Sequence, residues 1–385
     1  MSAQSVAATL ARASQARTPV GIAGAGTKAA WGGVAPPAGV TISTYELNRA
    51  IEHRHGDLTA TVPAGASLSD VNRELARHGQ WIPLDPPWSD RATIGGIVAT
   101  NDSGPRRHRF GAPRDLIIGV EVIRVDGTIA KSGGIVVKNV AGYDLGRLMT
   151  GSFGSLAVIA SATFKLYPTS PASRTVVIEL GDDRSAKALA ERVLVPLTAS
   201  HLTPSALEIA SHPMRLLVRF ESFETAAAQQ ADEAARIAVS NGATPSILTA
   251  DDETALWTGH AQRPWRGDGA VIKVTCLPTD VGPTVEWLNE SLSDVDWEVV
   301  GRAGLGVLLL RIGGDVPRQT RAIGEVRARF TPGRGTAVIV RASDDLKRSA
   351  DVWGPPGDSL RLMRAIKQQF DPHRLLNPGR GPFGL

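Results

Sequence analysis

The chain has 385 residues, 42% of them hydrophobic, and its 42 lysines and arginines exceed its 38 aspartates and glutamates by a formal charge of +4. This length is too great for one hydrophobic core, so we expect two domains. The small charge excess does not call for nucleic acid, and no apolar run is long enough to span a membrane. The single cysteine, Cys276, excludes an internal disulfide and a cysteine-ligated iron–sulfur cluster or zinc site within the chain.

The first part of the chain predicts short strands with brief helices between them. Residues 1–19 are alanine-rich but contain Arg12, which predicts a short amphipathic helix rather than a secretory signal and favours the cytoplasm. The segment "SLSDVNRELARHG" predicts a helix that begins after Ser67 and ends at Gly79. The predicted strands are "VGIA", "TATVPA", "GGIVAT", "LIIGVEVIRV", "GTIAKSG" and "LAVIASATFKL". This irregular alternation predicts an α+β fold rather than repeated βαβ units.

The pattern of predicted helices and strands changes after the Pro/Ser-rich residues 168–172, where we place a domain boundary. Longer helices such as "ETAAAQQADEAARIAVSNGA" then alternate with strands such as "TVVIEL", "RLLVRF", "AVIKVTC" and "GVLLLRI". We expect residues 1–170 and 171–355 to form two domains, the second an antiparallel sheet covered by helices. Residues 356–385 are expected to form a helix and a Pro/Gly tail.

A glycine loop, "GIAGAGTKAAWGG", follows the first predicted strand. Gly24, Gly26 and Ala29 fit the dinucleotide fingerprint G-x-G-x-x-A, but "WGGVAPP" directly behind it cannot form the long helix that the motif needs. A phosphate-binding P-loop would need Gly-Lys-Ser/Thr, whereas the order here is Gly26-Thr27-Lys28. A turn without a ligand is the third alternative for the loop taken alone.

Further motifs follow this loop in order: "VPAGASLSDVNREL", "LDPP", "ATIGGIVATNDSG", "RFGAPRD", "KNVAGYDL" and "GSFGSLAVI". Together they resemble the FAD-binding domain of the vanillyl-alcohol oxidase and p-cresol methylhydroxylase (PCMH) superfamily, over about residues 17–168. The resemblance implies a PCMH-type FAD-binding domain of two subdomains, followed by an antiparallel α+β cap domain. Glycine amides turned inward suit the diphosphate of FAD, because they contact an anion without side-chain clashes.

The resemblance also implies which residues contact the cofactor. They come from the glycine loop, from a second wall of the cofactor channel, and from the C-terminal tail that would return to the FAD-binding domain. The expected cofactor-binding residues are Gly24, Ala25, Gly26, Thr27, Lys28, Gly32, Pro86, Thr93, Gly95, Gly96, Ser103, Gly111, Val158, Ile159 and Asn377. Some members of the superfamily bond FAD to a histidine of the first loop; this loop has none, so we expect a non-covalent flavin.

The last part of the chain resembles the C-terminal region of FAD-linked oxidases, most clearly in "IKQQFDPHRLLNPGR". The 2-hydroxy-acid dehydrogenases of that group carry the motif G-H-x-G-D-G-N-x-H, whose histidines supply metal or substrate contacts. The corresponding stretch here, "GRAGLGVLL", keeps the glycines but has Arg302, Leu305, Val307 and Leu309 at the ligand positions. Leucine and valine cannot bind a metal or move a proton, so we expect no metal site.

This combination is similar to the FAD-binding E subunits of bacterial glycolate oxidase (glycolate dehydrogenase) complexes. The resemblance implies that the complex oxidises glycolate to glyoxylate, and that its partners are a catalytic flavoprotein, the D subunit, and an iron–sulfur protein, the F subunit. Electrons would leave through flavin and the partner's iron–sulfur centres. The chain would be cytoplasmic or held at the inner membrane through these partners, and its own role would be electron relay or assembly.

The alternative is a self-sufficient flavin-dependent 2-hydroxy-acid dehydrogenase. Such an enzyme docks the substrate carboxylate on an arginine, removes the hydroxyl proton with a base and passes a hydride to the flavin. The arginine cluster "GPRRHRFGAPR" is one source of candidates, and it could face a phosphate, an acidic substrate or a partner's acidic patch. The candidate catalytic residues are Arg106, Arg107, His108, Lys138, Tyr143 and Arg302.

Overall fold

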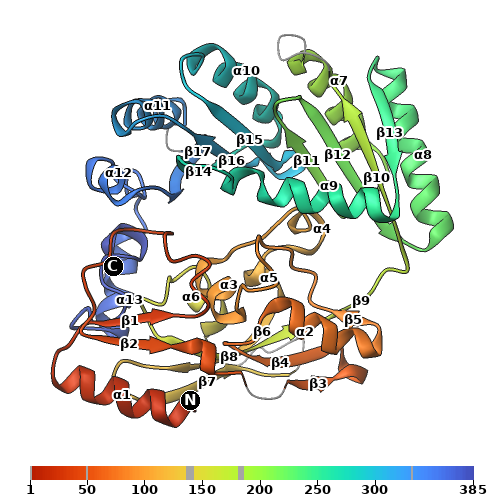
Figure 1. The fold of residues 1–385 in the computed structure, drawn as a ribbon. Coiled ribbons are helices and arrows are strands. Elements are labelled where there is room, and N and C mark those ends of the chain that lie inside the picture. Colours follow the sequence, from red (N-terminus) through yellow and green to blue (C-terminus); the bar gives the residue numbers. More distant parts are fainter. Residues whose placement is uncertain (1, 49–50, 136–142, 181–185, 331–332) are drawn as a thin grey trace. The chain divides into compact units, whose positions relative to one another are not determined.

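The computed structural model describes the chain except residues 1, 49–50, 136–142, 181–185 and 331–332. It divides into two compact units (Figure 1). Unit 1 comprises residues 1–104, 110–169 and 355–385, and unit 2 comprises residues 105–109 and 170–354. The short segment 105–109 therefore leaves the first unit and packs within the second.

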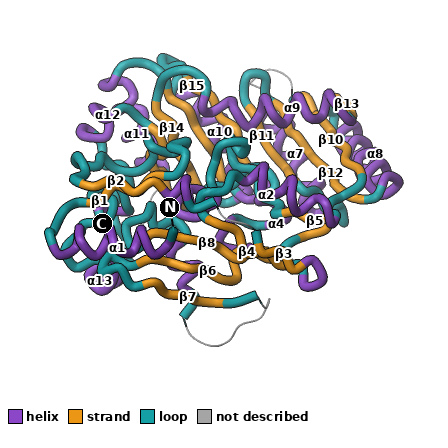
Figure 2. Tube along the Cα trace, turned by 60° about the horizontal axis from the view of Figure 1, so that its bottom comes forward, coloured by secondary structure: helices purple, strands orange, loops and turns teal. Residues whose placement is uncertain are grey.

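Unit 1 begins with a small subdomain that brings the first and last described segments together. Helix α1 (Ala3–Gln15) is capped by Ser2, whose hydroxyl accepts the Ser5 N–H, and strand β1 (Val20–Ala23) pairs in parallel with β2 (Val40–Ser43). The buried side of α1 packs with β1 and β2 in a hydrophobic cluster that includes Leu375 and Leu376 of the C-terminal tail. Figure 2 shows the tail beside β1 and α1.

A five-stranded antiparallel sheet forms the second subdomain of unit 1, in the order β3-β4-β8-β6-β7. Its strands are β3 (Glu52–Arg54), β4 (Thr59–Pro63), β6 (Ile117–Ile123), β7 (Ile129–Gly133) and β8 (Val158–Lys165). Around it lie α2 (Leu68–Leu75), α3 (Ile94–Thr100), α5 (Pro113–Leu116), α6 (Leu145–Met149), α13 (Leu360–Phe370) and the two-stranded sheet of β5 (Gln80–Trp81) with β9 (Tyr167–Pro168). A continuous apolar core joins the sheet to α2 and α3.

Two helices of unit 1 test the predictions made from the sequence. Helix α2 confirms its start, since the Ser67 hydroxyl accepts the Asp70 N–H, and a single 3-10 turn continues it to Gly79. The prediction of a strand for "GGIVAT" is wrong, because these residues form α3. Thr93 caps this helix, and its buried residues Ile94, Ile97 and Val98 follow helical spacing, which outweighs their β-branched character.

Unit 2 is an eight-stranded antiparallel sheet in the order β13-β10-β12-β11-β15-β16-β14-β17. Its strands are β10 (Ala172–Glu179), β11 (Ala206–Ala210), β12 (Arg215–Ser222), β13 (Thr244–Leu248), β14 (Ala270–Cys276), β15 (Trp297–Arg302), β16 (Val307–Ile312) and β17 (Gly335–Arg341). Its helices are α7 (Ala186–Ala199), α8 (Glu224–Ser240), α9 (Ala250–Gln262), α10 (Val281–Ser291), α11 (Val316–Arg329) and α12 (Asp344–Ser349). The predicted α+β class is confirmed.

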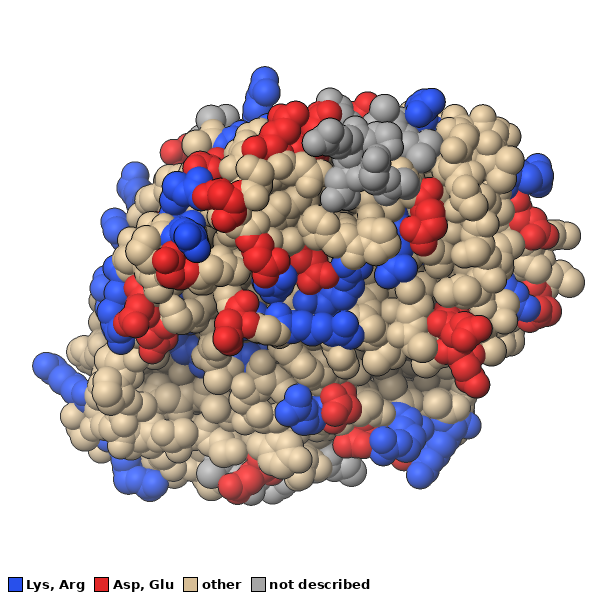
Figure 3. Space-filling model, turned by 45° about the horizontal axis from the view of Figure 1, so that its top comes forward, with Lys and Arg blue, Asp and Glu red and all other residues tan. Residues whose placement is uncertain are grey.

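Strand β10 of unit 2 buries both of its faces. Val176 and Ile178 of β10 point into the main core formed with α7, α8, α10 and α11, whereas Val177 between them packs against Trp257 of α9. This alternation follows from the two-residue period of a strand. Over much of the surface shown in Figure 3, acidic and basic side chains lie next to each other, as expected from their mixing in the sequence.

Segment 105–109 is fixed to the rest of unit 2 by a buried ion pair. Arg106 donates to both carboxylate oxygens of Glu221 on β12, from Nη2 at 2.7 Å and from Nε at 3.0 Å. Burial by itself would raise the pKa of Glu221, but the hydrogen bonds and charge of Arg106, together with Arg219, lower this pKa to about 2. A two-point contact of this kind fixes orientation as well as charge.

We expect Glu221→Gln to lower the free energy of unfolding by roughly 3 kcal/mol at pH 7, because the pKa of the carboxylate is about 2 in the folded chain and near 4.5 in the unfolded chain. A pKa that folding depresses contributes stability above the unfolded value, and this contribution disappears as the pH falls from 4.5 toward 2. Urea unfolding at neutral and acidic pH measures the effect. If the difference in unfolding free energy between Glu221→Gln and the wild type stayed the same at acidic pH, that result would contradict the ion pair.

The matched control is Glu224→Gln. Glu224 also pairs with an arginine, Arg174, but its side chain is 65% exposed. Because exposed ion pairs contribute little, this variant should stay within about 0.5 kcal/mol of the wild type at either pH.

Candidate functional site

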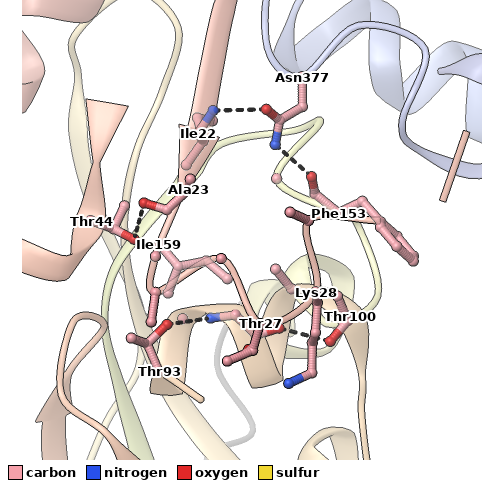
Figure 4. A pocket seen from close by; sticks show the side chains of 18 of the residues that line it. Ile22, Ala23, Thr27, Lys28, Thr44, Thr93, Thr100, Phe153, Ile159 and Asn377 are labelled. Atoms are coloured by element: carbon pink, nitrogen blue, oxygen red, sulfur yellow. Dashed lines mark hydrogen bonds between the residues drawn. The ribbon is translucent and has the colours of Figure 1, made fainter. Parts of the chain in front are cut away.

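A cavity in unit 1 lies between the glycine loop and the segments packed against it (Figure 4). Its walls come from the end of β1 and the loop that follows, from α3, from the turn before β8, and from the C-terminal tail. Gly24 and Ala25 also border a second hollow of about 1010 Å³ that runs along α2. The loop therefore faces two adjoining spaces, which suits an elongated ligand.

The glycine loop approaches α3 more closely than a side chain would allow. A Cβ atom on Gly24 would lie 2.3 Å from the Thr93 hydroxyl oxygen, whose place is fixed by its bond with the Gly96 N–H. Gly26 has a φ of +73°, which glycine adopts without strain. Within the described part of the chain, the backbone N–H groups of Ala25, Gly26 and Thr27 have no hydrogen-bond acceptor, so they are available to an anion in the cavity.

The C-terminal tail holds the opposite side of the cavity. Asn377 accepts the Ile22 N–H at 2.8 Å and donates to the Phe153 carbonyl at 2.8 Å, which joins β1 to the turn before β8 (Figure 4). The tail itself turns around the buried Asp371, whose carboxylate accepts the Leu375 and Leu376 N–H groups. The same carboxylate pairs with Lys367 of α13 at 2.8 Å.

Two cationic side chains border the cavity. Lys28 is buried, and its ammonium lies 3.2 Å from the Asp102 carboxylate and 5.5 Å from the centre of the Trp31 ring. Arg380 of the tail donates from Nη2 to the Lys28 carbonyl at 2.9 Å and to the Ala29 carbonyl at 3.2 Å. The glycine loop is thus tied through Asp102 to the residues that follow α3, and through Arg380 to the tail.

Most of the cofactor-binding residues expected from the sequence meet in this cavity. Those that line it are Gly24, Ala25, Gly26, Thr27, Lys28, Thr93, Gly95, Gly96, Ile159 and Asn377. They come from four segments that are distant in the sequence. Their contact with a cofactor remains a prediction.

The other expected residues do not line the cavity: Gly32, Pro86, Ser103, Gly111 and Val158. Val158 points into the core shared with α1 because it alternates with Ile159 along β8. Gly32 packs against the Arg380 carbonyl and the Phe153 ring, behind the loop. Gly111 packs against Asp115. For all five, contact with a cofactor stays a prediction.

The sequence analysis missed several residues that line the cavity. They are Ile22, Ala23, Ala29, Thr44, Ala99, Thr100, Phe153, Gly154, Ala157 and Arg380. Phe153, Gly154 and Ala157 lie inside the motif "GSFGSLAVI", and Arg380 is the last residue of "NPGR". These motifs could have identified the four residues as part of the cavity. Thr44 offers no such signal: its hydroxyl donates to the Ala23 carbonyl, a contact created by the pairing of β1 with β2.

Three of the candidate catalytic residues are held inside unit 2. Arg302 lies 3.6 Å from Glu208, which also contacts His260 at 2.9 Å, and all three are buried. Arg106 is bound to Glu221 as described above. His108 packs against Gly304, where burial lowers the pKa of the imidazole and the charge of Glu208 raises it in part.

The remaining candidate catalytic residues are Arg107, Lys138 and Tyr143. Arg107 begins the short helix α4 (Arg107–Phe110), and Tyr143 is 91% exposed. Lys138 lies outside the described residues. In the described ranges, no group of three or more His, Cys, Asp and Glu side chains could hold a metal ion. No helix there is both long and apolar enough to cross a bilayer.

Comparisons with protein families identify two matching regions. Residues 1–133 match the family described as "FAD binding domain", and residues 355–380 match "FAD linked oxidases, C-terminal domain". The first region contains the glycine loop and α3, and the second contains the tail with Asn377 and Arg380. Both matched regions therefore contribute to the cavity.

Several curated proteins are similar over nearly the whole chain. A D-lactate dehydrogenase of Archaeoglobus fulgidus is 31% identical, over 98% of this chain and 89% of its own length. Glycolate oxidase subunit GlcE of Escherichia coli is 29% identical, over 94% of this chain and 93% of its own length. Glycolate oxidase subunit GlcD of Bacillus subtilis is 27% identical, over 95% and 84%.

Solved structures with low sequence identity share the fold. An alkyldihydroxyacetonephosphate synthase has a TM-score of 0.71 at 15% identity, over 98% of this chain and 74% of its own. A glucooligosaccharide oxidase of Acremonium strictum has a TM-score of 0.71 at 14% identity, over 100% of this chain and 90% of its own. These likenesses concern the fold alone.

We expect Gly24→Ala to weaken FAD binding about tenfold, because the added methyl group displaces the loop or Thr93, and overpacking of this kind costs about 1–3 kcal/mol. Fluorescence titration of the flavin-free protein with FAD measures the dissociation constant. The control is Gly324→Ala on α11, where an added Cβ meets nothing within 4 Å. Unchanged affinity in Gly24→Ala would show that the loop does not hold the cofactor.

Proposed function

Because the chain belongs to the family of FAD-linked oxidases with a PCMH-type FAD-binding domain, we propose that it serves the oxidation of a 2-hydroxy acid as the FAD-binding subunit of a glycolate oxidase complex. The observation that carries this proposal is the agreement among its relatives, which are named for glycolate, D-lactate and D-2-hydroxyglutarate. Each of these acids has a hydroxyl group on the carbon next to a carboxylate. Oxidation of that carbon gives a 2-oxo acid.

The residues of the cavity fit FAD. Among the described residues, the N–H groups of Ala25, Gly26 and Thr27 have no acceptor, which suits the diphosphate of FAD. The absence of a Cβ on Gly24 lets the loop lie directly against Thr93. When bound, FAD supplies a ring that can accept electrons and pass them on. The chain's part in this chemistry is to bind and orient the cofactor through the glycine loop, α3 and the tail.

We propose that the flavin is bound without a covalent bond. The glucooligosaccharide oxidase of Acremonium strictum, which has a similar fold, carries a 6-S-cysteinyl, 8α-N1-histidyl FAD. Such attachment uses a cysteine and a histidine side chain, and none of the described residues that line the cavity is of either type. The FAD should therefore be removable by denaturation without cleavage of a bond.

This subunit acts in electron relay or assembly rather than in substrate oxidation. Two of the arginines able to dock a carboxylate, Arg106 and Arg302, are paired with Glu221 and Glu208 within unit 2. Leu305, Val307 and Leu309 cannot ligate a metal or transfer a proton.

In this proposal the partner subunits supply the substrate-oxidising site and the iron–sulfur centres. A catalytic flavoprotein, the D subunit of the complex, would oxidise glycolate. An iron–sulfur protein, the F subunit, would carry electrons onward, since the single cysteine of this chain cannot ligate a cluster. Any attachment to the inner membrane would be made through these partners.

The second candidate is a self-sufficient flavin-dependent 2-hydroxy-acid dehydrogenase. It is favoured by the match to the D-lactate dehydrogenase of Archaeoglobus fulgidus, which extends over 98% of this chain. The two candidates differ in one measurable property. Only a self-sufficient dehydrogenase reduces its flavin with a hydroxy acid in the absence of other subunits.

The purified chain, loaded with FAD and free of oxygen, is mixed with glycolate, D-lactate or D-2-hydroxyglutarate while the visible absorbance of the flavin is recorded. We expect no bleaching within minutes from the chain alone, and bleaching after the catalytic flavoprotein partner is added with glycolate. Dithionite provides the control for a reducible flavin. Rapid bleaching by a hydroxy acid alone would establish the second candidate, and a chain that takes up no FAD would refute both.

A further inference from the structure

The two cations that border the cavity differ in how their charges are balanced. Lys28 is buried against Asp102, and the two formal charges cancel. This pair ties the glycine loop to the residues that follow α3 and leaves no net charge at its position. An anion that enters the cavity would have to compete with Asp102 for the Lys28 ammonium.

In the part of the chain that the structure describes, Arg380 has no acidic partner of this kind. Among the described residues, no carboxylate lies within the 4.0 Å of an ion pair from its guanidinium. Its Nε atom is shielded from solvent and has no hydrogen-bond acceptor there. Burial lowers the pKa of Arg380, and no neighbouring acidic group offsets this. A partly buried cation without a counter-ion is stabilised by a ligand that supplies negative charge.

The rest of the Arg380 side chain fixes its position. Nη2 donates to the carbonyls of Lys28, Ala29 and Trp31, at 2.9, 3.2 and 3.4 Å. In the same region the Gly33 N–H donates to the Arg380 carbonyl at 3.1 Å. The guanidinium is therefore held against the loop whose Ala25, Gly26 and Thr27 N–H groups lack acceptors.

We propose that Arg380 supplies the positive charge with which the glycine loop binds the diphosphate of the cofactor, whereas Lys28 serves to anchor the loop. This inference rests on the proposed binding of FAD. It follows from the different partners of the two cations, and it assigns a binding role to a residue that the loop sequence does not contain. The chemistry recognised is that of a diphosphate, since charged groups and main-chain amides bind phosphate oxygens together.

Arg380→Gln tests the assignment, because glutamine keeps an amide that can donate to the loop carbonyls but removes the charge. Fluorescence titration of the flavin-free full chain should show FAD affinity at least about tenfold weaker than in the wild type. Arg380→Lys, which keeps the charge, should lose less than about threefold. Inorganic diphosphate should raise the Tm of the flavin-free wild type and leave that of Arg380→Gln unchanged.

The matched control is Arg374→Gln, an exposed arginine of the same tail that does not border the cavity. It should bind FAD as the wild type does. Wild-type affinity in Arg380→Gln overturns the inference, as does an equal loss in Arg380→Lys and Arg380→Gln, which would assign Arg380 a purely geometric role. Failure of the wild type itself to bind FAD refutes the proposed function instead, so the two failures are distinguishable. Melting of each flavin-free variant shows that it is folded.

Discussion

The side-chain amide of Asn377 connects two walls of the cavity by hydrogen bonds. It joins the backbone of Ile22 to that of Phe153, so one residue of the tail fixes two walls of the cavity that come from much earlier segments. The position of Asn377 depends in turn on the buried turn around Asp371 and on Lys367. The glycine loop can present its amides to a ligand because this frame holds it in place before any ligand arrives.

Local sequence signals predicted the parts of the site that depend on local chemistry. The glycine loop, the Ser67 cap and most of the strands follow from residue type and spacing, and the structure has them where these patterns place them. The residues "GGIVAT" form a helix instead of the predicted strand, because the cap at Thr93 and the helical spacing of the apolar residues outweigh their β-branched character. Thr44 borders the cavity through a contact that neither spacing nor composition encodes, whereas the motif "NPGR" marks Arg380 but not its contact with Lys28.

Unit 2 combines a large antiparallel sheet with buried charges that are matched within the unit itself. Glu208 is placed between Arg302 and His260, and Glu221 between Arg106 and Arg219. Side chains that are paired in this way stabilise the position of segment 105–109 on the sheet, yet they are less able to receive a substrate carboxylate. Strands β15 and β16 pair within this sheet, and Val307 and Leu309 of β16 are apolar.

The contact between the tail and the glycine loop can form only late in the synthesis of the protein. Arg380 is translated 352 residues after Lys28, whose carbonyl it holds. Until the tail emerges from the ribosome, β1 lacks its bridge to Leu376 and the loop lacks the donors that bind its carbonyls. The cavity therefore gains its last wall only when the tail is translated, and a polypeptide that stalls before this segment lacks that wall.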